Sequence, residues 1–304
     1  NFFIKFFNKF KISKLYFLDN VSTKNKIKSK QIKIIKQNFN SFNLNKLKID
    51  IIIHAATIAS PIFYRKYPLE TSDANVLGIR KILDYGKKNK SISILFFSSS
   101  EIYGNPDNKN IPTKENYNGN VSCIGPRACY DESKRYAETL CYIYAKYFNV
   151  SVKVVRPFNN YGPGLKINDG RAPADFANSI IKNKNIVIFS NGKSKRSFCY
   201  IADACVGFIN SVILKRYKVL NIGNNKEIKI ITLAKKFVKV GEKISRYNKK
   251  IVFKINPDKN YLKDSPIRRC PDLTCAKNLI NYRPKISLEE GIKKYLIYLK
   301  NAKF

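Results

Sequence analysis

The sequence has no methionine, no tryptophan and only one histidine, His54, among its 304 residues. A single histidine could serve at most one Ser-His-Asp triad, with no second histidine to spare. It also excludes most zinc sites, so we expect no metal. The seven cysteines are an odd number and form no CxxC pair, which is typical of free thiols in a reducing cytosol. We therefore predict a cytoplasmic protein.

Acidic residues are scarce, with 21 carboxylates against 58 basic side chains and a net charge of +37. Such a bias raises nucleic acid or an anionic membrane as a partner. The lysines are spread along the whole chain and do not alternate with aromatic residues, so we interpret them as a solvated surface that attracts anionic nucleotides. The longest apolar runs, such as 51–53 and 92–97, are strand-sized. We expect neither a nucleic-acid nor a membrane partner.

Glycine does not occur before Gly78. A glycine-rich turn that seats a pyrophosphate on a helix N-terminus is therefore missing from the sequence. The apolar and basic stretch 1–10 lacks the order of segments of a signal peptide and is interpreted as the end of an amphipathic helix. We expect this sequence to start inside a domain, through truncation of the gene product or of its sequence.

Short apolar runs alternate with helical patterns along the chain, which predicts a doubly wound α/β fold. The run at 50–55 has the uninterrupted apolar pattern of a parallel strand covered on both faces. Further strands are expected at 14–18, 32–35, 91–97, 150–155, 186–189 and 218–222. Helices are expected at 75–88, 137–148, 174–181, 232–240 and 288–300.

The pattern predicts a Rossmann-type parallel sheet with a smaller C-terminal substrate-binding lobe. We assign residues 1–157 to the cofactor-binding domain, without its first strand and glycine-rich turn, and expect 196–222 to return to it. The lobe is assigned to 158–195 and 223–304. The region after Arg156 is rich in glycine, proline and asparagine, which indicates a loop at the sheet edge.

Tyr130 and Lys134 are four residues apart, so on a helix they share one face. A lysine ammonium beside a phenol favours the phenolate, and we expect Lys134 to lower the pKa of Tyr130 and make it a base for an alcohol proton. A chance pair on a solvated helix is the alternative. The hydroxyl cluster 98–100 follows a predicted buried strand, at the edge where open α/β sheets bind ligands. Its alternative is an ordinary polar turn.

Seven short motifs carry a resemblance to a known family. They are HAA (54–56), SSEIYG (99–104), GPRACYDESKR (125–135), FNNYGP (158–163), NDGR (168–171), RSFCYIAD (196–203) and RCPD (269–272). In order and spacing the chain resembles the extended short-chain dehydrogenases, and within them it is most similar to UDP-glucuronate decarboxylases. The resemblance runs from about residue 17 to residue 299, and GPRACYDE is its most specific part.

The resemblance implies roles for four catalytic residues. Tyr130 would be the base on the sugar 4-hydroxyl, and Lys134 would hold the nicotinamide ribose. Ser99 stands where the family has a hydroxyl that orients the sugar, and Glu101 would be an additional acid/base group. The resemblance implies no catalytic role for His54, which we expect to pack at the sheet edge near the cofactor.

The same resemblance implies residues that bind the cofactor and the substrate. Asp19, with Asn20 after it, matches the acidic residue that binds the adenosine ribose, and the Ala55-Ala56 pair would line the NAD site. Substrate contacts are implied for Asn159, Arg171, Arg196 and Arg269. The arginines suit a diphosphate or a sugar carboxylate because a guanidinium binds such groups in a bidentate manner. Their alternative is plain surface charge.

The implied activity is NAD-dependent decarboxylation of UDP-glucuronate to UDP-xylose through a 4-keto intermediate, in a homodimer. A 4,6-dehydratase or an epimerase acting on a dTDP- or GDP-sugar is the near alternative. The Ser100-Glu101 pair disfavours dTDP-glucose dehydratases, which carry Asp-Glu, and does not separate GDP-mannose dehydratases. A non-catalytic remnant that has abandoned NAD binding is the alternative from another class.

Overall fold

Four parallel strands form the centre of the protein in the computed structural model, which describes residues 12–19, 30–167, 170–258, 260, 263 and 265–302. Their order in the sheet is β10-β5-β4-β3. The strands are β3 (Ile51–His54), β4 (Ser93–Phe97), β5 (Val152–Pro157) and β10 (Lys218–Ile222). The parallel α/β architecture predicted from the sequence is confirmed. The helix end expected over 1–10, Asn20 and the pair Asn168-Asp169 lie outside the described residues.

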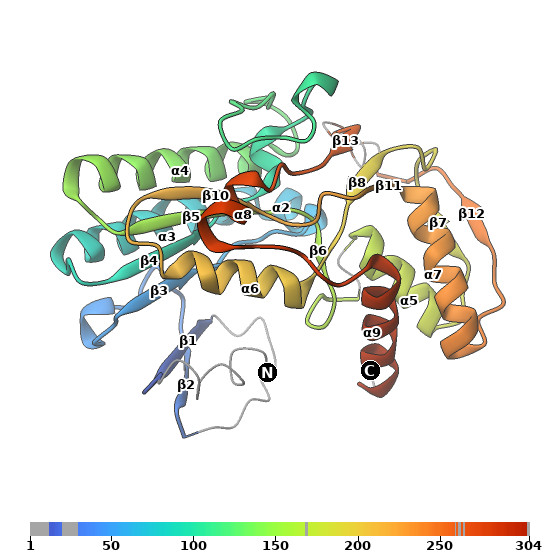
Figure 1. The fold of residues 1–304 in the computed structure, drawn as a ribbon, viewed down its shortest axis with the longest axis horizontal. Coiled ribbons are helices and arrows are strands. Elements are labelled where there is room, and N and C mark those ends of the chain that lie inside the picture. The colour runs from blue at the N-terminus through green and yellow to red at the C-terminus, as the bar shows by residue number, and fades with distance from the viewer. Residues whose placement is uncertain are drawn as a thin grey trace.

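Side chains of these strands alternate between two apolar cores, because successive residues of a strand point to opposite faces. Ile94 and Phe96 enter the core under α3 (Pro68–Lys88) and α4 (Ala128–Phe148). Leu95 enters the core under α6 (Ile201–Val212). Figure 1 shows α3 and α4 on one side of the sheet and α6 on the other. Both faces are therefore covered, as the apolar strand pattern predicts.

The first two strands form a separate sheet. β1 (Leu15–Asp19) pairs in parallel with β2 (Ile32–Lys36), and within the described ranges neither strand pairs with β3. As the edge of the four-stranded sheet, β3 leaves Ile51 50% and Ile53 39% exposed. The predicted single sheet is thus divided in two, because no described strand joins β1 to β3.

The smaller lobe packs three helices around its own core. These are α5 (Ala172–Ile181), α7 (Ile230–Ser245) and α9 (Leu288–Asn301), with β7 (Ile186–Ile188) and β12 (Ile251–Phe253) beside them. Phe176 of α5, Phe237 of α7 and Tyr295 of α9 are fully buried there. Figure 1 shows this lobe at one end of the central sheet.

Short strands connect the lobe with the central sheet. They are β6 (Asn160–Tyr161), which pairs with β9 (Cys199–Tyr200), and β11 (Glu227–Lys229), β8 (Lys195–Ser197) and β13 (Arg268–Arg269), which form a three-stranded sheet. Two further α-helices of the described residues are α2 (Pro61–Lys66) and α8 (Thr274–Ile280). Helix α8 packs in the same core as α6 and β10.

The elements expected from the sequence are present, with shifted ends. Helix α3 begins at Pro68, seven residues before the predicted start at 75, and α4 begins at Ala128. Proline is favoured in the first turn because its fixed φ suits a helix and its missing N–H has no partner there. No helix in the described ranges is long and apolar enough to cross a membrane.

Candidate active site

Tyr130 and Lys134 lie on the buried face of α4, where both side chains meet the carboxyl end of β4. The Nζ of Lys134 donates a hydrogen bond to the Phe97 carbonyl (2.7 Å) and lies 4.8 Å from the centre of the Phe96 ring. Ser99 follows β4, accepts a hydrogen bond from the Glu101 amide (3.2 Å), and lies close enough to the Tyr130 phenol to lower its pKa. The structure therefore brings Ser99, Tyr130 and Lys134 together.

The pKa of the Tyr130 phenol lies above its ordinary value. Burial raises its pKa to about 12, and this effect exceeds the lowering by Ser99 and by the nearby Arg171. The expected net lowering of the Tyr130 pKa is therefore not found here, because burial outweighs the neighbouring groups, and the contribution of Lys134 to this pKa stays a prediction. Burial also lowers the pKa of Lys134 to about 7, so its amine is only partly protonated near neutral pH. Its Nζ lies 5.9 Å from the centre of the Tyr130 ring.

Glu101 is held by two arginines from different parts of the chain. It lies in the 3-10 helix η2 (Ser100–Tyr103) and forms ion pairs with Arg127, before α4, and with Arg269 on β13, whose Nη2 is 2.7 Å from Oε2. Burial would raise the pKa of Glu101, but the two guanidinium groups outweigh burial and hold it at about 2. Glu101 is therefore a permanent carboxylate that joins the central domain to the lobe.

Arg127 and Asp131 belong to this cluster and were not assigned from the sequence. The Nε of Arg127 lies 3.4 Å from Asp131 Oδ2, one helical turn further on. Burial, with the Glu101 charge second, raises the pKa of Asp131 to about 7. The available signal was spacing, because Arg127 and Asp131 are four residues apart, like Tyr130 and Lys134.

Two of the predicted substrate arginines lie side by side. Arg196 on β8 is opposite Arg269 on β13. The guanidinium of Arg196 donates to the carbonyl oxygens of Pro266 (2.5 Å) and Ile267 (3.1 Å), which holds the segment before β13. Burial, followed by the charge of Arg269, lowers the pKa of Arg196 to about 9. The pair concentrates positive charge beside Glu101.

The other predicted substrate residues occupy loops near this edge. Asn159 has a φ of 39° and donates from Nδ2 to the Ser197 carbonyl (2.9 Å). A positive φ suits asparagine better than most residues. Arg171 precedes α5 and lies near enough to Tyr130 to lower the pKa of that phenol. Both residues are half-buried.

Three of the predicted cofactor residues, unlike Lys134, lie at the ends of β1 and β3. Asp19 ends β1, and Ala55 and Ala56 follow β3 with both residues exposed. Asn20 lies outside the described residues. The end of β3 is connected to α4 by hydrogen bonds from Thr57 to Asn75 (2.6 Å) and from Asn75 to Ser133 (2.8 Å).

His54 is buried between the Phe39 and Phe96 rings, at 5.5 and 5.9 Å. Burial, then the charge of Lys134, lowers its pKa to about 3, so the imidazole is neutral. Gly78 leaves room for it, since a Cβ there would come within 3.2 Å of the ring. His54 therefore packs at the end of the edge strand β3, and the absence of a catalytic role stays a prediction.

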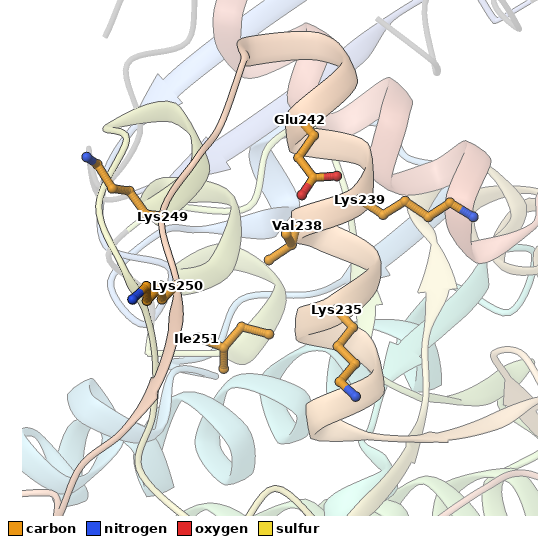
Figure 2. A pocket seen from close by; sticks show the side chains of 7 residues that line it. All are labelled: Lys235, Val238, Lys239, Glu242, Lys249, Lys250 and Ile251. Carbon is orange, nitrogen blue, oxygen red and sulfur yellow. The ribbon is translucent and has the colours of Figure 1, made fainter.

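A cavity of about 440 Å³ lies in the lobe and shares no residue with the Tyr130 group. Figure 2 shows it between α7 and the segment that leads into β12, with Lys239 and Lys249 pointing away from the hollow in opposite directions. The ammonium groups therefore do not converge on one point. The lining residues are Lys235, Val238, Lys239, Glu242, Lys249, Lys250 and Ile251.

A parallel sheet covered by helices on both faces, with its polar residues at the carboxyl edge, defines a Rossmann-type α/β protein. The chain belongs to the NAD dependent epimerase/dehydratase family, whose model matches residues 9–223.

Curated relatives of the chain are UDP-glucuronic acid decarboxylases. One from Xenopus tropicalis is 35% identical over 257 residues, which are 84% of this chain and 58% of that protein. One from Arabidopsis thaliana is 37% identical over 246 residues, 81% of this chain and 53% of that protein. The chain thus spans about half the length of the curated relatives it matches.

Solved structures share the fold at lower sequence identity. The UDP-glucose 4-epimerase of Thermotoga maritima has a TM-score of 0.85 and 21% identity, with 99% of this chain and 94% of that chain covered. The UDP-glucuronic acid 4-epimerase of Bacillus cereus, in complex with NAD, has a TM-score of 0.75 and 23% identity, with 91% and 83% covered.

Proposed function

We propose that this protein binds NAD and a nucleotide sugar and decarboxylates UDP-glucuronate to UDP-xylose through a 4-keto intermediate. The observation that carries the proposal is the meeting of Tyr130, Ser99 and Lys134 at the carboxyl end of β4. A phenol beside a hydroxyl and an ammonium suits proton exchange with a sugar hydroxyl. The names of the curated relatives supply the substrate.

Residues of the described chain fit two parts of an NAD molecule. Asp19, at the end of β1, suits the adenosine ribose hydroxyls, and the exposed Ala55 and Ala56 leave the end of β3 open to a ligand. Lys134 would hold the nicotinamide ribose. The described residues contain no glycine-rich turn for the pyrophosphate. NAD, when bound, supplies a hydride acceptor and a cationic ring.

The chain's own residues would move the protons of the reaction. Tyr130 has to lose its proton before it can accept one from the sugar 4-hydroxyl. Cations near the phenol lower its pKa, as Arg171 already does. Once C4 is a ketone, it lies β to the C6 carboxylate, and the electrons left by CO2 flow into the carbonyl. A proton taken up from water at C5 restores the ketone, and return of the hydride to C4 and of a proton to its oxygen then gives the pentose.

The pairing of Glu101 favours decarboxylation over dehydration. A dehydratase has to protonate a leaving hydroxyl, which requires an acid that carries a proton. Two arginines keep Glu101 ionised, with a pKa of about 2. A decarboxylase needs only the ketone, and Arg196, opposite Arg269 and without a carboxylate partner among the described ion pairs, provides a cation for an anionic sugar nucleotide. The acid/base role for Glu101 implied by the family would require it to leave this ion-pair cluster.

A label in the substrate carboxylate tests the reaction type. With UDP-[6-¹³C]glucuronate and NAD, we expect labelled CO2 and a UDP-pentose in equal amounts. Label that stays in the sugar beside an inverted C4 would indicate an epimerase, a reaction type found among the similar solved structures. A 4-keto-6-deoxy product from dTDP-glucose would indicate a dehydratase. Absence of any product would favour a non-catalytic protein.

We further propose a cytoplasmic homodimer that pairs through α3 and α4. Both helices expose large apolar side chains, among them Leu77 (54%), Tyr136 (53%) and Tyr147 (71%). The seven cysteines, which are all free, suit a reducing compartment. Light scattering after size exclusion should give twice the chain mass for the native protein and a lower mass for Leu77→Glu. Equal monomer masses would contradict the dimer.

A further inference from the structure

The hydroxyl of Tyr64 is a buried polar group with no hydrogen-bond partner among the described residues. Tyr64 lies in α2 and is 1% exposed. Buried hydroxyls are almost always hydrogen-bonded, because a buried hydroxyl without a partner has lost its hydrogen bonds to water and gained none in return. A hydroxyl left in this state next to a reaction centre suits a donor reserved for a ligand.

The surroundings of Tyr64 place it in the candidate active site. Its ring stacks on the ring of Tyr130, with centroids 5.2 Å apart and planes at 15°. The guanidinium of Arg127 lies 5.8 Å from the Tyr64 ring centre. Two further unpartnered buried atoms, Asp131 Oδ1 and Arg269 Nε, belong to the same polar cluster around Glu101. A ligand that reaches Tyr130 therefore comes next to Tyr64.

On this geometry we propose that the Tyr64 hydroxyl donates a hydrogen bond to the carboxylate of the substrate sugar and selects carboxylated sugars. The inference rests on the proposed function. Tyr64 presents a donor beside the positive Arg127, which favours an anionic oxygen over a sugar hydroxyl.

A neutral donor also suits the reaction better than a cation. The carboxylate loses its charge as CO2 departs, so an ion pair would stabilise the ground state more than the transition state and slow the step. The guanidiniums of Arg127 and Arg269 are already paired with Glu101. Tyr64 can therefore orient the carboxylate without the strong ground-state attraction of a free cation.

The test compares UDP-glucuronate and UDP-glucose binding to the NAD-saturated full chain and to Tyr64→Phe, which keeps the stacked ring. We expect Tyr64→Phe to weaken UDP-glucuronate binding about 10- to 100-fold, the range for hydrogen bonds to charged groups, and to leave UDP-glucose affinity almost unchanged. Decarboxylation kcat/KM should fall similarly. Both ligands are titrated separately into portions of the same protein preparation. The ratio of the two affinities then does not depend on the fraction of folded protein.

Tyr161→Phe is the matched control, because it removes a buried hydroxyl that donates to the Leu288 carbonyl (3.2 Å) in the lobe. It should leave the ratio of the two affinities unchanged. If Tyr64→Phe weakens both ligands equally, or neither, the Tyr64 assignment is overturned while the proposed function stands. If the native protein binds neither ligand, the proposed function fails, and the Tyr64 assignment with it.

Discussion

The carboxyl ends of β4 and β3 lie next to each other in one sheet, and they are built differently. After β4, Lys134 donates a hydrogen bond to the strand end, and Glu101 forms ion pairs with Arg127 and with Arg269 of β13. We call this the interlocked region. After β3, the exposed Ala55 and Ala56 offer mainly backbone, and β1 with Asp19 belongs to another sheet. The region after β4, proposed for proton transfer, is thus held by its own side chains, whereas the region after β3, proposed for the cofactor, presents mainly main-chain groups.

The largest expected effect is a loss of activity on substitution of Tyr130, which should affect the region after β4 and not the region after β3. Tyr130→Phe removes only the ionisable hydroxyl, so product formation should fall by about 10²–10⁴-fold, the usual loss of acid/base catalysis. NAD affinity from calorimetry should hardly change. Tyr142→Phe, at an exposed position on the same helix, is the control and should stay active. Near-normal turnover by Tyr130→Phe would show that Tyr130 is not the base.

Loss of the Glu101 charge should destabilise the interlocked region. Glu101→Gln leaves Arg127 and Arg269 without their carboxylate. We expect the free energy of unfolding in urea to fall by about 2–3 kcal/mol. This loss is smaller than that for a fully buried ion pair, because Glu101 is partly exposed. The double variant with Arg127→Gln should lose less than the sum of the single losses. Glu289→Gln, which breaks an exposed pair with Lys236, should change little. Additive losses would mean that the cluster is not cooperative.

Much of the first region could be predicted from the sequence. The spacing of Tyr130 and Lys134 and the hydroxyls after a buried strand located Ser99, Tyr130 and Lys134, because helical period and strand direction are local properties. The partners of Glu101 could not be found in this way. Arg127 and Arg269 are 26 and 168 residues away from it, and only the folded chain decides which charges meet.

The pKa values could not be predicted from residue type. A lysine near a tyrosine predicts a more acidic phenol, yet burial dominates here and raises the pKa of Tyr130. Burial depends on how α4 packs against β4, which is a tertiary property.

The division into two sheets follows from the absence of a described strand between β1 and β3. The assignment of 158–195 and 223–304 to the lobe stays a prediction.

Lys134 should make the stability of the interlocked region depend on pH. Its folded pKa of about 7 is below the ordinary 10.5, so stability is fully present above pH 10.5 and is lost as pH falls towards 7. The free energy of unfolding should rise from pH 7 to 10 by up to about 1.4 kcal/mol per unit more than in Lys134→Met. Lys153, with a pKa of about 8, contributes equally to both proteins. Parallel profiles would show that Lys134 is charged in the fold.

The smallest expected effect concerns the cofactor region. Asp19→Asn removes the charge that suits the adenosine ribose, so we expect about tenfold weaker NAD binding in calorimetry, as for one hydrogen bond to a charged group. At saturating NAD the turnover number should equal that of the native protein. A drop in turnover that persists at saturation would show that the two regions are not independent.

The buried His54 has a consequence for experiments near neutrality. Histidine is the side chain that usually titrates between pH 5 and 8, and this protein has only one. With a pKa of about 3, that imidazole is silent throughout this range. An inflection in a rate profile near pH 7 would therefore not come from this imidazole, and in the described part of the chain Asp131 and Lys134 have pKa values of about 7.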